Sequence, residues 1–100
     1  MATTSKALAR TAAATSSTTL YTVPASTTTV VTNIGVTNTA GSAGTFTIAL
    51  NGVALHTTTA VAANSTVYID LKQVLSATQT ITGLASATTI NFHISGVEIA

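Results

Sequence analysis

The fold class is decided by the stretch Thr45-Phe-Thr-Ile-Ala-Leu50-Asn51-Gly52-Val53-Ala-Leu-His-Thr-Thr-Thr59. In its first half Phe46, Ile48 and Leu50 alternate with smaller residues, which is the period of a half-buried strand. The following Asn51-Gly52 pair is a strong hairpin signal, because a type I′ turn needs positive φ at both central residues. The sequence therefore predicts two antiparallel strands, 45–50 and 53–59, joined by a two-residue turn.

Similar alternating stretches fill the chain on both sides of this hairpin. Pro24 cannot donate to a strand ladder and closes the first of them. Leu71, Val74 and Leu75 stand at helical spacing, so one helical turn over 70–75 stays open as an alternative. Short strands with turns at intervals of roughly eight to twelve residues are typical of a sandwich. We predict an all-β fold, an antiparallel, jelly-roll-like β-sandwich of seven to eight short strands: 18–23, 27–39, 45–50, 53–59, 66–71, 78–84 and 88–99.

Two of these strands carry expectations about individual side chains. In 27–39, Val30, Ile34 and Val36 share one parity and are expected to face the same side. In the last strand the apolar parity changes between Ile94 and Val97. A one-residue slip would expose half of that strand, so we predict a β-bulge at Ser95-Gly96.

Residues 1–17 differ from the rest of the chain because they are rich in Ser, Thr and Ala and contain no acid. We divide the chain into an extended N-terminal arm, residues 1–17, and a single β-sandwich domain, residues 18–100. A low-complexity terminus is ordered where something ties it down. We therefore expect the arm to lie along a partner, with Lys6, Leu8 and Arg10 contacting an acidic, partly apolar groove.

Charge is scarce in this sequence. Lys, Arg, Asp and Glu together make up 5% of the residues, against about a quarter in an ordinary soluble domain. Interspersed charges keep proteins apart from their own copies, so a neutral, Thr-rich surface indicates assembly with neighbouring subunits. The net charge of +1 offers no basic patch for nucleic acid, and the apolar runs are too short for a membrane-spanning helix.

Few residues could carry chemistry. The chain has no cysteine, and the residues that could form a catalytic or metal-binding centre are His56, His93, Asp70 and Glu98. No two of them have short metal-ligand spacing, and none belongs to a recognisable nucleophile–base arrangement. We predict no enzyme activity, no metal and no cofactor. His56 and His93 are expected to point away from the core, and with Tyr21 they complete the candidate interface residues.

Two segments resemble small virion proteins of tailed bacteriophages. The first is Leu20-Tyr-Thr-Val-Pro24-Ala-Ser-Thr-Thr-Thr-Val-Val-Thr-Asn-Ile34 followed by Val36-Thr-Asn38. The second is Ile81-Thr-Gly-Leu-Ala85 with Ile90-Asn-Phe-His-Ile-Ser-Gly-Val-Glu-Ile99. The resemblance spans most of residues 8–99. It implies a β-sandwich on the virion, as in capsid decoration (cement) proteins or tail and neck accessory proteins, with no catalytic motif to transfer.

The composition and the resemblance lead to the same expectation. The first hypothesis is a capsid decoration protein on the outer surface of the virion that bridges and stabilises capsomers, bound to the major capsid protein or other virion proteins. We expect a homo-oligomer, for which a trimer fits closed point-group assembly. The alternatives are a tail, neck or fibre-associated virion protein and a carbohydrate- or receptor-binding sandwich module.

Overall fold

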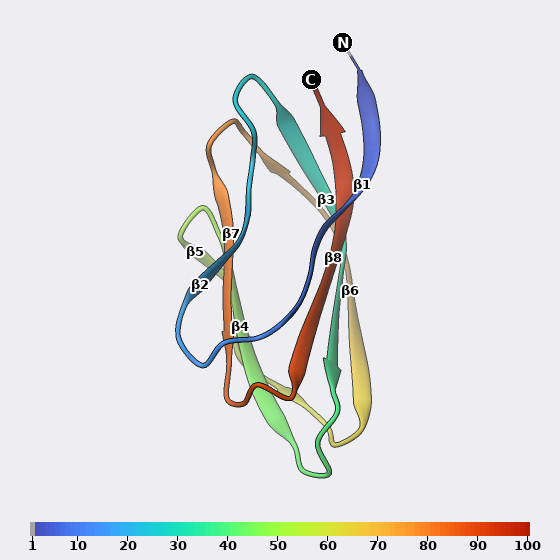
Figure 1. Ribbon diagram of the computed structural model, residues 1–100, viewed down its shortest axis with the longest axis vertical. Coiled ribbons are helices and arrows are strands. Elements are labelled where there is room, and N and C mark those ends of the chain that lie inside the picture. Colours follow the sequence, from blue (N-terminus) through green and yellow to red (C-terminus); the bar gives the residue numbers. More distant parts are fainter. Residues whose placement is uncertain (1) are drawn as a thin grey trace.

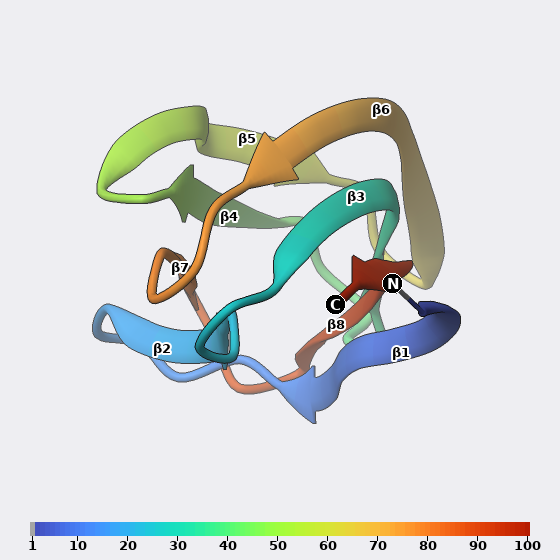
Figure 2. The same cartoon turned by 90° about the horizontal axis from the view of Figure 1, so that it is seen from above.

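The protein consists of eight antiparallel strands in two four-stranded sheets. A computed structural model describes residues 2–100, and none of these residues is helical. One sheet has the strand order β1-β8-β3-β6 and the other the order β2-β7-β4-β5. They form the sandwich-like arrangement seen in Figures 1 and 2. The strands are β1 (Thr3–Ala12), β2 (Thr18–Thr22), β3 (Thr28–Asn38), β4 (Gly44–Leu50), β5 (Val53–Val61), β6 (Ser65–Leu75), β7 (Thr80–Ala85) and β8 (Ile90–Ile99).

The pairing follows a single long ribbon folded back on itself. The hairpin of β4 and β5 is its tip, and β3 with β6, β2 with β7 and β1 with β8 continue the ribbon away from that tip. At the tip Asn51 and Gly52 have φ values of 51° and 78°, so the predicted hairpin turn is confirmed. At the other end of this ribbon β1 and β8 bring Ala2 and Ala100 side by side (Figure 1), where their backbones exchange two hydrogen bonds.

The core lies between the two sheets and is built from both. The sheet that contains β4 contributes the buried side chains of Phe46 and Ile48. The sheet that contains β8 contributes those of Phe92 and Ile94. The rings of Phe46 and Phe92 meet edge to face with centroids 6.2 Å apart, an arrangement that aromatic pairs favour. The alternation predicted for β4 and for the first half of β8 is therefore confirmed.

The stretch expected to be an N-terminal arm is part of a sheet. Residues 3–12 form β1, which pairs with β8 from Thr3 to Ala12. The arm and domain division at residue 18 therefore does not match the strand arrangement. The physical reason is that without β1, strand β8 would be an edge strand with unpaired backbone N–H and C=O groups. The backbone of β1 pairs with these groups whether its side chains are polar or apolar.

The extra residue that we predicted in β8 occurs instead in the strands on either side of it. Gly96 and Ser95 are consecutive in the ladder, whereas β3 has an extra residue, Thr32, between their partners Val31 and Asn33. This extra residue reverses the parity of β3, so Val31 is buried in place of Val30. The prediction of a bulge within β8 is wrong, because β8 keeps its alternation and turns the small Gly96 inward where a side chain would not fit.

Residues 70–75 belong to β6, so the alternative of a helical turn there is wrong. Leu71 still packs against the core, as Val67 and Ile69 do. The residues that the structure describes contain no helix long and apolar enough to cross a membrane.

Candidate interaction site

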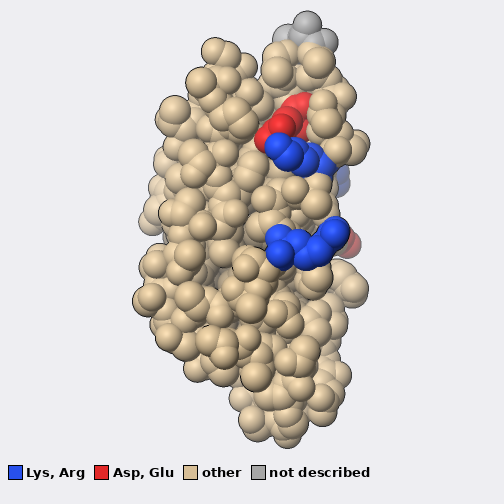
Figure 3. Space-filling model, viewed as in Figure 1, with Lys and Arg blue, Asp and Glu red and all other residues tan. Residues whose placement is uncertain are grey.

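Every charged residue of the chain lies on one of the two sheets. Lys6 and Arg10 are on β1, Asp70 and Lys72 on β6, and Glu98 on β8. We call β1-β8-β3-β6 the charged sheet and β2-β7-β4-β5 the neutral sheet. In Figure 3 the coloured side chains gather over the half occupied by the charged sheet, and the other half shows none.

Four of these five charges are on the two edge strands of the charged sheet. Charges on an edge strand discourage other strands from pairing with it. The edges of the neutral sheet have no such charges. Instead β2 is only five residues long and β5 has two register shifts, which also disturb edge pairing.

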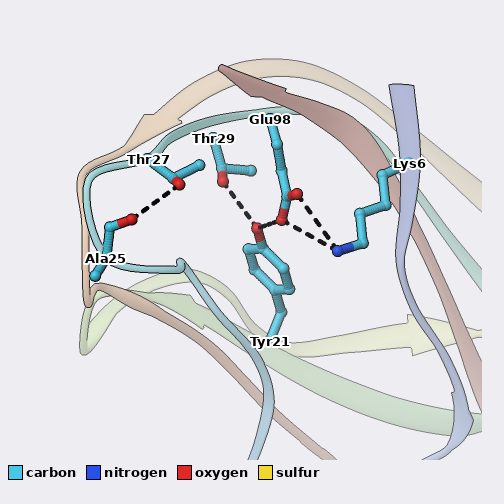
Figure 4. A network of polar contacts seen from close by, with 6 residues as sticks. All are labelled: Lys6, Tyr21, Ala25, Thr27, Thr29 and Glu98. Atoms are coloured by element: carbon cyan, nitrogen blue, oxygen red, sulfur yellow. Dashed lines mark hydrogen bonds and ion pairs between the residues drawn. The ribbon is translucent and has the colours of Figure 1, made fainter. Parts of the chain in front are cut away.

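A polar network closes one end of the seam, by which we mean the open side of the molecule between edge strands β1 and β2. Lys6 Nζ lies 3.4 Å from Glu98 Oε1, and the Tyr21 hydroxyl donates a short hydrogen bond to Glu98. Because the Tyr21 hydroxyl hydrogen is used in the bond to the carboxylate, the Thr29 hydroxyl donates to the Tyr21 oxygen, 2.9 Å away. Figure 4 shows that these side chains come from four strands and converge between the sheets.

The network shifts the acidities of two of its members. The hydrogen bond from Tyr21 lowers the pKa of the Glu98 carboxyl below its ordinary value of 4.5, with further lowering by Lys6. Burial raises the pKa of the Tyr21 hydroxyl above 10.0, and the hydrogen bond to Glu98 raises it further. Both shifts favour a neutral phenol donating to an ionised carboxylate. The network therefore links β1 and β8 to β2 through side-chain contacts.

Further along the seam a pocket opens between the same two strands. It has a volume of about 240 Å³, and Arg10 and Thr11 of β1 and Thr18 and Leu20 of β2 are among the residues that line it. Arg10 is exposed, and among residues 2–100 no carboxylate forms an ion pair with it. The seam thus combines one end that the polar network closes, where Glu98 neutralises the cation of Lys6, with an open pocket further along.

The seam brings together four of the six residues that the sequence singled out. Lys6 and Tyr21 have polar groups there, whereas Arg10 lines the pocket but pairs with the outward-facing His93, so its side chain starts from the outer face of the sheet. Leu8 also lies on β1, but it is only 8% exposed and belongs to the core, which leaves little of its side chain for the predicted contact with a partner groove. Its burial follows from the register shift between Ala7 and Ala9, which turns Leu8 inward.

The two histidines lie elsewhere. His93 is exposed on the outer face of the charged sheet, as expected, and pairs with Arg10 across β8 and β1. His56 does not point fully away from the core: it is half-buried, with its ring centroid 5.7 Å from that of Phe46. The cause is the register shift on each side of the pair Ile48 and His56, which turns part of β5 over.

The sequence reasoning missed the structural role of Glu98. Glu98 was considered only as one of the few residues that could carry chemistry, although a continuous β8 places it on the same side as Phe92 and Ile94. An inward carboxylate needs a donor or a cation, and that requirement is the signal that points to Tyr21 and Lys6. Within residues 2–100, no three His, Asp or Glu side chains gather closely enough to hold a metal ion.

No family model matches the sequence, and no curated protein is significantly similar to it.

Proposed function

We propose that this protein is a structural component of a bacteriophage virion that works by covering and bridging other subunits, most simply as a capsid decoration protein. The observation that carries the proposal is the charge distribution. One complete four-stranded sheet has no charged residue, while all five charges lie on the other sheet. A neutral sheet face of this kind is suited to contact with a neighbouring subunit, since it lacks the charges that keep copies apart.

The neutral sheet offers a surface that suits such a contact. Its outward residues are mainly threonines and alanines, for example Thr82, Ala49 and Ala54, which lie side by side in register on β7, β4 and β5. Threonine hydroxyls can hydrogen-bond across a wet interface, and its methyl group still buries apolar area. Contacts that are individually weak add up when many copies bind one shell.

The strand order supports the finer fold assignment, a jelly roll. In that fold a long two-stranded ribbon rolls up so that first and last, second and seventh, third and sixth, and fourth and fifth strands pair. The ladders of this protein follow that scheme in both sheets. Jelly rolls are common in viral capsid and lectin domains, so the assignment agrees with a virion protein but does not by itself identify a function.

The proposal is tested on the particles themselves. Capsids stripped of this protein should lose their contents at a lower temperature than intact capsids, and adding back the purified protein should restore the original temperature. Stripped capsids that withstand heat and osmotic shock as well as intact ones would refute the cementing role. The copy number decides where the protein sits: hundreds per particle for a decoration protein, or a few to a few dozen for a tail, neck or fibre position.

One observation favours the alternative of a carbohydrate-binding module. Tyr68 is 73% exposed on the outer face of the charged sheet, where its ring leans over Gly35 of the neighbouring strand, and His93 flanks Gly35 on the other side. An exposed aromatic ring is the platform on which sugars stack. Binding of a glycan that is lost in Tyr68→Ala and kept in Val74→Ala, which alters an exposed residue of the same strand, would support this function. Equal binding by both variants would exclude it.

A further inference from the structure

The outer face of the charged sheet carries a row of residues, one from each strand. Arg10 of β1 is opposite His93 of β8, His93 is opposite Gly35 of β3, and Gly35 is opposite Tyr68 of β6. Residues that lie directly opposite in a ladder point to the same side of the sheet, and the side chains of Arg10, His93 and Tyr68 are exposed. Because neighbouring strands are about 4.8 Å apart, this outer row extends over about 14 Å.

Gly35 sets the position of the aromatic ring in the outer row. A Cβ atom built on Gly35 would lie 3.1 Å from Tyr68 Cε1 and 3.6 Å from His93 Cβ. The ring of Tyr68 therefore leans from β6 across β3 towards His93, into the space that a side chain at Gly35 would need. Tyr68 is still 73% exposed, so most of its ring is open to a ligand, and an aromatic ring offers a large apolar surface for contact.

The surroundings of the ring differ in charge on its two sides. Along β6, Asp70 follows Tyr68 on the same face, and its Oδ1 accepts a hydrogen bond from Asn33 Nδ2 at 3.2 Å. Across the row, Arg10 has no ion-pair partner among residues 2–100. A ligand that packs on Tyr68 therefore meets an acceptor of hydroxyl groups beside the ring and a cation at the far end of the row. This arrangement favours a carboxylate directed towards Arg10 and disfavours one beside Asp70.

We propose that the outer row binds an acidic saccharide, with a sugar ring packed on Tyr68 and a sugar carboxylate paired with Arg10 and hydrogen-bonded by His93. The inference names the ligand class for the carbohydrate-binding alternative given above, and it rests on that function. A free small anion would use Arg10 without Tyr68, and a neutral saccharide would gain nothing from Arg10. The outer row belongs to the sheet opposite the neutral one, so covering the neutral sheet would leave it open.

The test is a titration of the isolated, 15N-labelled protein followed by NMR. The probes are trigalacturonic acid and sialyllactose, each compared with its own carboxyl methyl ester. At least one acid is expected to shift the amide signals of Gly35, Tyr68 and His93. It should bind about fivefold more tightly than its ester, a gain typical of exposed charge pairs. Sodium acetate at the same concentration should not shift the signal of Tyr68.

Three variants assign the contacts. Tyr68→Ala should abolish binding of both the acid and the ester, whereas Arg10→Gln should lower the affinity for the acid to that for the ester. Lys72→Gln is the matched control, because it removes another exposed cation of the same sheet, and it should keep the preference for the acid. All three side chains are exposed, so the variants should fold as the wild type does.

The outcomes separate this inference from the functions on which it is built. Equal binding of acid and ester would overturn the acidic ligand and keep carbohydrate binding. Binding of neither acid, shifts confined to the neutral sheet, or a preference lost in Lys72→Gln but kept in Arg10→Gln would overturn the proposed site. The cementing role is decided by the particle experiment and does not depend on any of these results.

Discussion

Gly96 shows at the level of one residue how closely β8 fits between its neighbours. A methyl group at this position would run into the carbonyl oxygen of Val30 and come within 2.9 Å of Leu8 Cδ1. The first of these atoms is backbone and cannot move without disturbing β3. The position is therefore closed to any side chain, although its backbone angles do not themselves demand glycine.

We predict that Gly96→Ala lowers the free energy of unfolding by about 1 to 3 kcal/mol, the usual cost of inserting a methyl group into a packed site. Gly41→Ala is the matched control, because a methyl group there meets nothing within 4 Å. It should change stability by no more than about 0.5 kcal/mol. Urea denaturation of both variants measures the difference, and equal stability would contradict the packing described here.

Glu98 makes the stability of the protein depend on pH. Because its pKa is lower in the folded chain than the ordinary 4.5, its contribution is complete above that pH. The contribution is lost as the pH falls through the lower, folded value. Tyr21 acts at the other extreme: its raised pKa gives a contribution that is present below pH 10.0 and is lost as the pH rises through the folded value.

We therefore expect Glu98→Gln to lower the melting temperature at neutral pH and to make its decline below pH 4.5 shallower than in the wild type. Tyr21→Phe should also flatten this acid decline, because it removes the main cause of the lowered pKa of Glu98. Melting temperatures measured by circular dichroism between pH 2 and pH 7 test both. An acid decline of unchanged slope in Glu98→Gln would be inconsistent with the network.

At the level of elements, β1 is a strand with little apolar contact to the core. Nearly all of its side chains are exposed, and Leu8 is the one that is buried. β3, by contrast, buries residues along most of its length and has a neighbour on both sides. The attachment of β1 therefore depends on its ladder with β8, on Leu8 and on the contact of Lys6 with Glu98.

Hydrogen exchange should reveal this difference. We predict that the amides of β1 exchange at a lower opening free energy than those of β3 and β8, since local opening needs few apolar contacts to be broken. Leu8→Ala should speed exchange across β1. If β1 instead opened only with the whole protein, Leu8→Ala would lower the free energy of global unfolding by about 2 kcal/mol or more. Equal protection of β1 and β3 in the wild type would show that β1 is an integral part of the cooperative unit.

The whole molecule is asymmetric in charge, and this asymmetry predicts which side meets other subunits. Ala54→Lys places a charge on the neutral sheet, at an exposed position of β5. Gln73→Lys places the same charge at an exposed position of β6, which is already charged. We expect Ala54→Lys to reduce incorporation into particles at least tenfold and Gln73→Lys to leave it unchanged, as measured by the amount of each variant in purified particles. Equal incorporation would show that the neutral sheet is not the covered side.

The strands were predictable from the sequence because each depends on a local pattern. The alternation of Phe46 and Ile48 and the Asn51-Gly52 turn do not depend on the rest of the chain. The side that Val31, Leu8 and His56 face was not predictable, since each is set by an extra residue in the ladder with a neighbouring strand, which the pattern of one strand does not reveal. The seam was only partly predictable: Lys6, Arg10 and Tyr21 were chosen, but their meeting with Glu98 depends on pairing the first strand with the last.

The hydrogen bonds that join Ala2 and Ala100 in both directions place these two residues side by side at one pole. A peptide fused to either end would thus emerge from the same spot. A short glycine linker could also join the ends, with new termini opened in the loop 39–43 between β3 and β4, at the opposite end of the sandwich (Figure 1), since chains with neighbouring ends tolerate circular permutation. Such a permuted protein would present its cargo at that loop instead, so a foreign epitope could be displayed from two opposite poles of one scaffold.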